Sequence, residues 1–154
     1  MEWLNNITPT LVLLIGGGVG WFVKSKLEAK RRAEEALRDD RARTYTEILM
    51  PFAQLFTDLS SKSQEKALKE LKSLDYRKRS FQLVLVGSDE VINAWNRMWD
   101  ITYKAERGES DSKKIILGFG DVLLSIRKGL GNSGTKMKRK DMLRWLIKDI
   151  DSLE

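Results

Sequence analysis

The stretch WLNNITPTLVLLIGGGVGWFV, residues 3–23, decides the architecture of this chain. None of its 21 side chains carries a charge, and about 20 helical residues are enough to cross the hydrocarbon core of a bilayer. Trp3 and Trp21 stand near its two ends, where membrane helices often place aromatic side chains. The stretch therefore predicts one transmembrane helix within residues 1–23.

Three other interpretations of this stretch fit the residues less well. A secretory signal peptide has basic residues before its apolar run and a small-residue cleavage site after it, whereas here only Glu2 precedes the run and Trp21, Phe22 and Val23 end it. A buried core helix rarely stays uncharged over this length. A helix lying in the membrane interface would carry a charged face, and this stretch has none.

The charge changes abruptly at Lys24. Residues 24–43 hold eight basic and five acidic residues, a net charge of +3, and no basic residue precedes the apolar stretch. Positive charge accumulates on the cytoplasmic side of membrane helices, so we expect the N-terminus outside and the C-terminal body in the cytoplasm. Residues 24–43 are rich in good helix formers, and we expect them to extend the membrane helix as a juxtamembrane stalk near anionic lipid headgroups.

Glycine dominates the second half of the apolar stretch, where residues 16–20 read GGGVG. Each glycine costs about 1 kcal/mol of helix propensity relative to alanine, but small residues let membrane helices approach closely. We therefore expect homo-oligomerisation, with a pore as one form of it; a plain anchor that tolerates glycine is the alternative. The candidate pore and oligomerisation residues are Thr8, Thr10, Gly16, Gly17, Gly18 and Gly20.

The remaining residues, 44–154, predict a small all-α bundle that acts as a cytoplasmic ligand-sensing domain. Pro51 is expected to kink or restart the first helix of this bundle, and Ser61 with Gln64 resembles a capping box for the second. Residues 81–86 are rich in β-branched side chains, but helix is preferred to strand because no partner strand is evident. Apolar spacing predicts helices that begin near Tyr45, Ser61, Asp89, Ile115 and Lys138, the last of them ending near Ser152.

The composition argues against an enzyme. Lysine and arginine number 28 against 22 acidic residues, a net charge of +6, and there is no histidine or cysteine. Catalysis by Ser-His-Asp or Cys-His, finger-type zinc sites, haem ligation through His or Cys, iron–sulfur clusters and disulfides are thereby excluded. We expect no catalytic residue, metal site or cofactor, and a protein that binds anions instead.

A glycine-rich basic segment, RKGLGNSGTKMKRK at residues 127–140, holds six basic residues and no acidic one. Cations beside a glycine-rich turn, at the start of the predicted last helix, favour phosphate binding. The order Gly134-Thr135-Lys136 transposes the end of the P-loop pattern and follows a helix instead of a strand, so an NTPase is rejected. A flexible linker or a lipid-facing basic patch is the alternative interpretation.

A second basic cluster, residues 77–79, could converge on the same ligand. Aromatic residues between Tyr76 and Tyr103 could stack on bases, although at helical spacing they more often belong to a core. The candidate ligand-binding residues are Arg77, Lys78, Arg79, Arg127, Lys128, Asn132, Ser133, Thr135, Lys136, Lys138, Arg139 and Lys140.

The body contains SLDYRKRSFQLVLVGSDEVINAWN at residues 73–96 and LLSIRKGLGNSGTKMKRKDMLRWLIKDID at residues 123–151. Together with the glycine-bearing apolar stretch and the charged stalk, these resemble small bacterial membrane effectors of antiphage defence, most closely the channel effectors of Hailong-type systems. The resemblance implies a single-pass channel in the bacterial inner membrane and an oligonucleotide signal, such as oligodeoxyadenylate, made by a nucleotidyltransferase encoded nearby. It assigns ligand binding to the basic loop and the pore to Gly16–Gly20.

The expected function is thus a homo-oligomeric ion-channel effector of antiphage defence, gated by a nucleotide or oligonucleotide bound to the helical body. The alternative is a non-conducting, membrane-anchored adaptor that recruits a protein, lipid or nucleic-acid partner.

Overall fold

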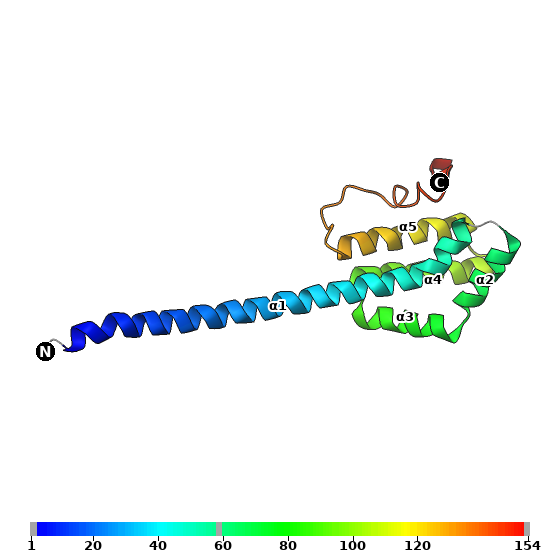
Figure 1. The fold of residues 1–154 in the computed structure, drawn as a ribbon. Helices are drawn as coiled ribbons and strands as arrows, with labels where there is room; N and C mark the ends of the chain where they lie inside the picture. Colours follow the sequence, from blue (N-terminus) through cyan, green and yellow to red (C-terminus); the bar gives the residue numbers. More distant parts are fainter. Residues whose placement is uncertain (1–2, 58–59, 153–154) are drawn as a thin grey trace. The chain divides into compact units, whose positions relative to one another are not determined.

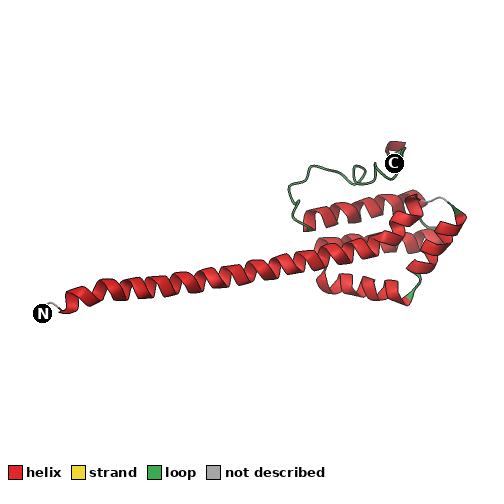
Figure 2. Ribbon diagram, viewed as in Figure 1, coloured by secondary structure: helices red, strands yellow, loops and turns green. Residues whose placement is uncertain are grey.

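The computed structural model describes residues 3–57 and 60–152, with side chains from Lys24 onward except at residues 56, 57 and 112. Within these residues every regular element is a helix and no strand is present, which confirms the all-α prediction (Figure 2). Residues 81–86 belong to a helix, as preferred. The elements are α1 Trp3–Thr57, α2 Ser61–Leu71, α3 Leu74–Val86, α4 Asp89–Glu106, α5 Ser112–Gly129 and a short 3-10 helix, η1 Ile150–Ser152 (Figure 1).

The chain divides into two compact units, Met1–Asp39 and Asp40–Glu154. In the first unit, nearly all described side chains of α1 are exposed, Leu27 among them. This part of the helix carries ion pairs between residues one helical turn apart, such as Lys24 and Glu28, whose charged atoms lie 3.9 Å from each other. Exposed pairs of this kind contribute only about 0.3–0.5 kcal/mol each, so helix propensity and not packing within the unit holds the helix here.

The predicted membrane stretch lies in this first unit. Its backbone is helical from Trp3, but the side chains of residues 3–23 are outside the described part of the chain, and so are all the candidate pore residues. Among the residues that are described, no helix is both long enough and apolar enough to cross a membrane.

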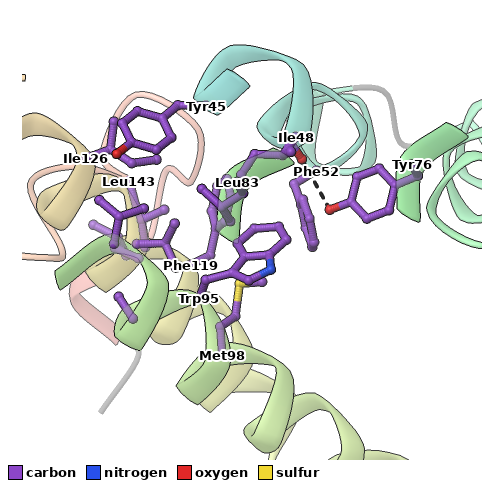
Figure 3. Close-up of a cluster of buried hydrophobic side chains, with 14 residues drawn as sticks. Tyr45, Ile48, Phe52, Tyr76, Leu83, Trp95, Met98, Phe119, Ile126 and Leu143 are labelled. Carbon is purple, nitrogen blue, oxygen red and sulfur yellow. Dashed lines mark hydrogen bonds between the residues drawn. The ribbon is translucent and has the colours of Figure 1, made fainter. Parts of the chain in front are cut away.

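The second unit is built around one aromatic-rich core (Figure 3). Tyr45, Ile48 and Phe52 face this core from α1, and they recur at the three- and four-residue spacing of one helix face. The Phe52 ring stacks on Phe119 of α5 with 5.4 Å between ring centroids and meets Trp95 of α4 edge-on at 5.8 Å. The C-terminal part of α1 is therefore a core element of the body.

Helices α4 and α5 pack along each other in opposite directions (Figure 1). Gly129, at the end of α5, lies against Ser88 at the start of α4, while Gly118 lies against Met98 in the middle of α4. This antiparallel pair places the end of α5, and the basic segment that follows it, beside the α3–α4 junction.

The helix boundaries differ from the predicted ones at three places. The second predicted helix is split in two, because the Ser73 side chain accepts a hydrogen bond from the Tyr76 amide at 3.1 Å and caps α3. The cap of α2 is Ser60, one residue earlier than predicted, and it accepts from the Ser63 amide. Ser88 does sit at the N-cap of α4, but its hydroxyl makes no capping hydrogen bond.

Two further expectations were wrong. A helix restart at Pro51 is wrong, because α1 continues through this residue, whose side chain is fully buried; the kink expected as the other outcome at Pro51 stays a prediction. The predicted helix over residues 138–152 is a series of turns that ends in η1. Backbone bonds here alternate between three- and four-residue spans: the Leu146 amide donates to the Leu143 carbonyl, whereas the Ile147 amide donates to the same Leu143 carbonyl from one residue further, so an unbroken α-helical ladder does not form.

Leu83 tests the core assignment with a control on the same helix. Leu83 is fully buried and Leu85, two residues later, is 68 % exposed. We expect Leu83→Ala to lower the unfolding free energy of the body by about 2–5 kcal/mol, because the substitution opens a cavity. Leu85→Ala should change it by less than about 0.5 kcal/mol. Urea unfolding followed by circular dichroism measures both, and equal effects would contradict the described packing.

Candidate functional site

The basic segment begins where α5 ends, and glycine fixes how it leaves the helix. Gly131 has φ 106°, in the left-handed region that suits glycine. Its amide donates to the Lys128 carbonyl at 3.1 Å, and the Asn132 amide donates to the Arg127 carbonyl at 3.2 Å. This pair of bonds is a Schellman motif. It consumes two of the backbone amides that the sequence offered to an anion.

Half of the cations in the segment are held by the protein itself. Arg127 donates to the Thr135 hydroxyl at 3.2 Å, which closes the loop on itself. The Arg139 guanidinium lies 3.6 Å from the Asp121 carboxylate of α5, and Lys140 donates to the Asp151 carbonyl at 3.4 Å. These three side chains therefore act first as structural contacts of the loop.

The other three cations are available to a ligand. Lys128, Lys136 and Lys138 make no ion pair with any carboxylate in the described part of the chain, and all three are exposed. Asn132 and Ser133 lie between them, exposed at the turn. We define these three lysines as the lysine triad. An exposed, unpaired lysine keeps its full charge for an external anion such as phosphate.

The loop returns along α5 and is anchored there. The Arg139 carbonyl lies so close to Gly120 that a Cβ atom at this position would be 2.7 Å from the carbonyl oxygen and 2.9 Å from Leu143. Leu143 and Ile150 are fully buried and fix the rest of the tail to the body. The absence of a side chain at Gly120 thus lets the segment that bears the lysine triad close onto the bundle.

An ion pair also fastens the end of the tail. Arg144 donates two hydrogen bonds to the Asp151 carboxylate, at 2.8 and 3.1 Å. This hydrogen bonding lowers the pKa of Asp151 below its usual value. A depressed carboxyl pKa stabilises the folded tail above the unfolded-state pKa, and the contribution is lost as acidification protonates Asp151.

The electrostatics correct one part of the predicted site. We expected the basic segment to precede a helix N-terminus, whose dipole attracts anions. Residues 138–149 form turns instead, and the loop follows the C-terminal end of α5, where the dipole is negative. The lysine charges therefore attract phosphate here without help from a helix dipole.

The second basic cluster is not brought into this loop by any described contact. On α3, Lys78 pairs with Asp75 at 3.5 Å and Arg79 pairs with Glu70 of α2 at 3.1 Å. Arg77 makes neither kind of contact and instead lines a cleft of about 590 Å3 together with Trp99 and Tyr103. The sequence predicted one cluster of Arg77, Lys78 and Arg79. In the structure, Arg77 lines the cleft, whereas Lys78 and Arg79 are held in ion pairs.

The candidate stacking residues fall into two groups. Trp95 and Tyr76 are buried in the core, and the Tyr76 hydroxyl donates to the Ile48 carbonyl at 3.3 Å (Figure 3). Burial is the main cause that raises the pKa of Tyr76 above its usual value. Phe81 and Tyr103 are exposed. Trp99 is partly buried against the core. Phe81 and Tyr103 can therefore offer a full ring face to a ligand without unfolding of the body, and Trp99 can offer part of one.

No cluster of three or more acidic side chains able to hold a metal ion occurs in the described part of the chain. The chain matches no protein-family model, no curated protein and no solved structure. The arrangement itself therefore carries the functional argument: three free lysines on a glycine-shaped loop, held to a helical body that shares α1 with the apolar stretch.

Gly120 tests how the loop is held. Alanine at a helical position normally gains about 1 kcal/mol over glycine, but here its Cβ would collide with the Arg139 carbonyl. We expect Gly120→Ala to lower the urea midpoint of the full-length chain. The control is Gly134→Ala, where a Cβ would meet nothing within 4 Å and no loss should follow. An unchanged urea midpoint for Gly120→Ala would contradict the close contact between Gly120 and the Arg139 carbonyl.

Proposed function

We propose that this chain is a single-span membrane protein whose helical body binds a nucleotide or oligonucleotide at the lysine triad, and that the bound ligand gates a pore formed by the spans of several copies. The observation that carries the proposal is the continuity of α1 from Trp3 to Thr57. The uncharged stretch and the core residues Tyr45, Ile48 and Phe52 belong to one helix. In the proposed mechanism, a change in the packing of these core residues reaches the apolar stretch through α1.

The loop supports the ligand half of this proposal. Single-stranded nucleic acid presents evenly spaced phosphates, and binding to it depends on cations that displace counterions. Lys128, Lys136 and Lys138 supply such cations on one short segment. The ammonium groups of these lysines make no ion pair with a described carboxylate. A polyanion can therefore bind them without breaking an existing ion pair.

The apolar stretch and the stalk support the assembly half. Four glycines within residues 16–20 permit close approach of neighbouring helices in lipid. Past the stretch, Leu27 and Leu37 are exposed on α1 and are free to pack between copies. A ligand gates such an assembly only by binding its open and closed forms with different affinity.

The biological setting belongs to the same proposal and rests on the resemblance to Hailong-type effectors. Under it, the protein sits in the bacterial inner membrane with its body in the cytoplasm. A neighbouring nucleotidyltransferase supplies the oligonucleotide, and conduction through the pore depolarises an infected cell.

Ion flux tests the channel. Full-length protein in liposomes should pass ions, and the flux should change when a single-stranded oligodeoxyadenylate is added on the side of the body. Empty liposomes treated with the same oligonucleotide are the control. Vesicles that stay sealed with and without the ligand would rule out conduction. If the same vesicles still bind the ligand, the protein is an anchored adaptor.

Neutralising the lysine triad tests the ligand site. The variant Lys128→Gln/Lys136→Gln/Lys138→Gln should weaken oligodeoxyadenylate binding, and the slope of log affinity against log salt should fall by about 2, since each lost phosphate contact removes about 0.7. The matched control removes the same charge from α2 with Lys62→Gln/Lys66→Gln/Lys69→Gln. Equal effects of the two triples would show a response to net charge and not to the loop.

A further inference from the structure

The cleft that Arg77 lines is separate from the lysine triad. Its walls come from α1, α2, α3, α4 and the start of α5, and it includes Trp99, Tyr103 and Ile115. Ile115 lies one turn into α5, whereas the triad begins at the opposite end of that helix. At 1.5 Å per residue, the 13 residue steps from Ile115 to Lys128 cover about 20 Å. The cleft and the start of the lysine triad at Lys128 therefore lie at opposite ends of α5.

The cleft combines an aromatic wall with unpaired cations. Trp99 lies 5.8 Å from Tyr103 between ring centroids, with the planes inclined by only 32°, and Trp99 in turn contacts Trp95 and Phe52 edge-on. Tyr103 ends this series of rings and is 52 % exposed. A flat ring placed on Tyr103 would extend the series by one member, which is the way nucleobases stack on aromatic side chains.

The polar groups at the cleft favour an anion. The side chains of Arg77 and Lys72 line it and pair with no carboxylate in the described part of the chain. Glu106 is the one acidic side chain in the lining, so the charge balance there is +1. A guanidinium binds phosphate through two parallel hydrogen bonds. The volume of about 590 Å3 is within the range of small-molecule sites.

We infer that this cleft binds a nucleoside monophosphate, with the base stacked on Tyr103 and the phosphate held by Arg77 and Lys72. This goes beyond the proposed function, because the cleft takes a mononucleotide at a place apart from the lysine triad. It gives the body a second binding site, which shares no residue with the lysine triad.

Equilibrium dialysis of the full-length protein against labelled adenosine monophosphate tests the site. Saturable binding is expected, and adenosine without phosphate should bind at least about tenfold more weakly. Arg77→Gln should also weaken binding, but by less than removal of the phosphate, because Lys72 still contacts the phosphate. The control is Lys78→Gln, which removes the same charge from the next residue, and it should bind as the wild type does because Lys78 pairs with Asp75.

Tyr103 provides the test of stacking. Tyr103→Ala should weaken binding about tenfold, as expected for one base-stacking partner, whereas Tyr103→Phe keeps the ring and should retain the affinity. Absence of saturable binding, or binding unchanged in both Arg77→Gln and Tyr103→Ala, would overturn the inference. Loss of mononucleotide binding in the lysine-triad variant alone would also overturn it, since the nucleotide would then sit on the loop. These outcomes do not change the oligonucleotide-binding and ion-flux measurements. The mononucleotide site can therefore be disproved while the proposed channel function stands, and the reverse also holds.

Discussion

Burial of one face of α1 is the constraint on which the body depends. Tyr45, Ile48 and Phe52 enter the core from this helix, and the rings of α4 and α5 are arranged around Phe52. Polar contacts reinforce the same face: Arg41 donates to the Val86 carbonyl, and the Tyr45 hydroxyl accepts from the Ser88 amide at 3.1 Å. The α3–α4 junction is thus tied to the helix that also carries the uncharged stretch.

Most of the helical fold could be predicted from the sequence because it depends on local periodicity. The apolar spacing of α4 and α5, and the cap position at Ser88, are visible without tertiary information. The errors arose where local hydrogen bonds depart from an unbroken helix ladder. The Ser73 side chain accepts from the Tyr76 amide and splits a helix, and mixed three- and four-residue turns replace the predicted last helix. Apolar periodicity does not report such departures.

The candidate site was predictable only as a collection of charges. The sequence identified the basic segment, but it gave no means of deciding which cations are already paired. Arg139 meets Asp121, 18 residues away in the chain, while Lys136 meets no described carboxylate. The cleft depended still more on tertiary structure, because Arg77 and Tyr103 come together only when α3 and α4 pack. Aromatic residues among basic ones were the available signal, and helical spacing alone favoured placing them in the core.

The way the tail is attached has a consequence for its dynamics. Between Gly129 and η1 the chain has no regular helix. Leu143 is its one fully buried side chain among the described residues, Ile150 is buried at the start of η1, and turns, partly buried side chains and the Arg139–Asp121 ion pair supply the other contacts. Segments with few buried anchors open at a lower free energy than the helices they cover. The tail should therefore exchange its amide hydrogens through a local opening while α4 and α5 stay folded. A polyanion that binds all three lysines of the triad would oppose this opening. Binding of the polyanion would then slow amide hydrogen exchange in the tail and leave exchange in α4 and α5 unchanged.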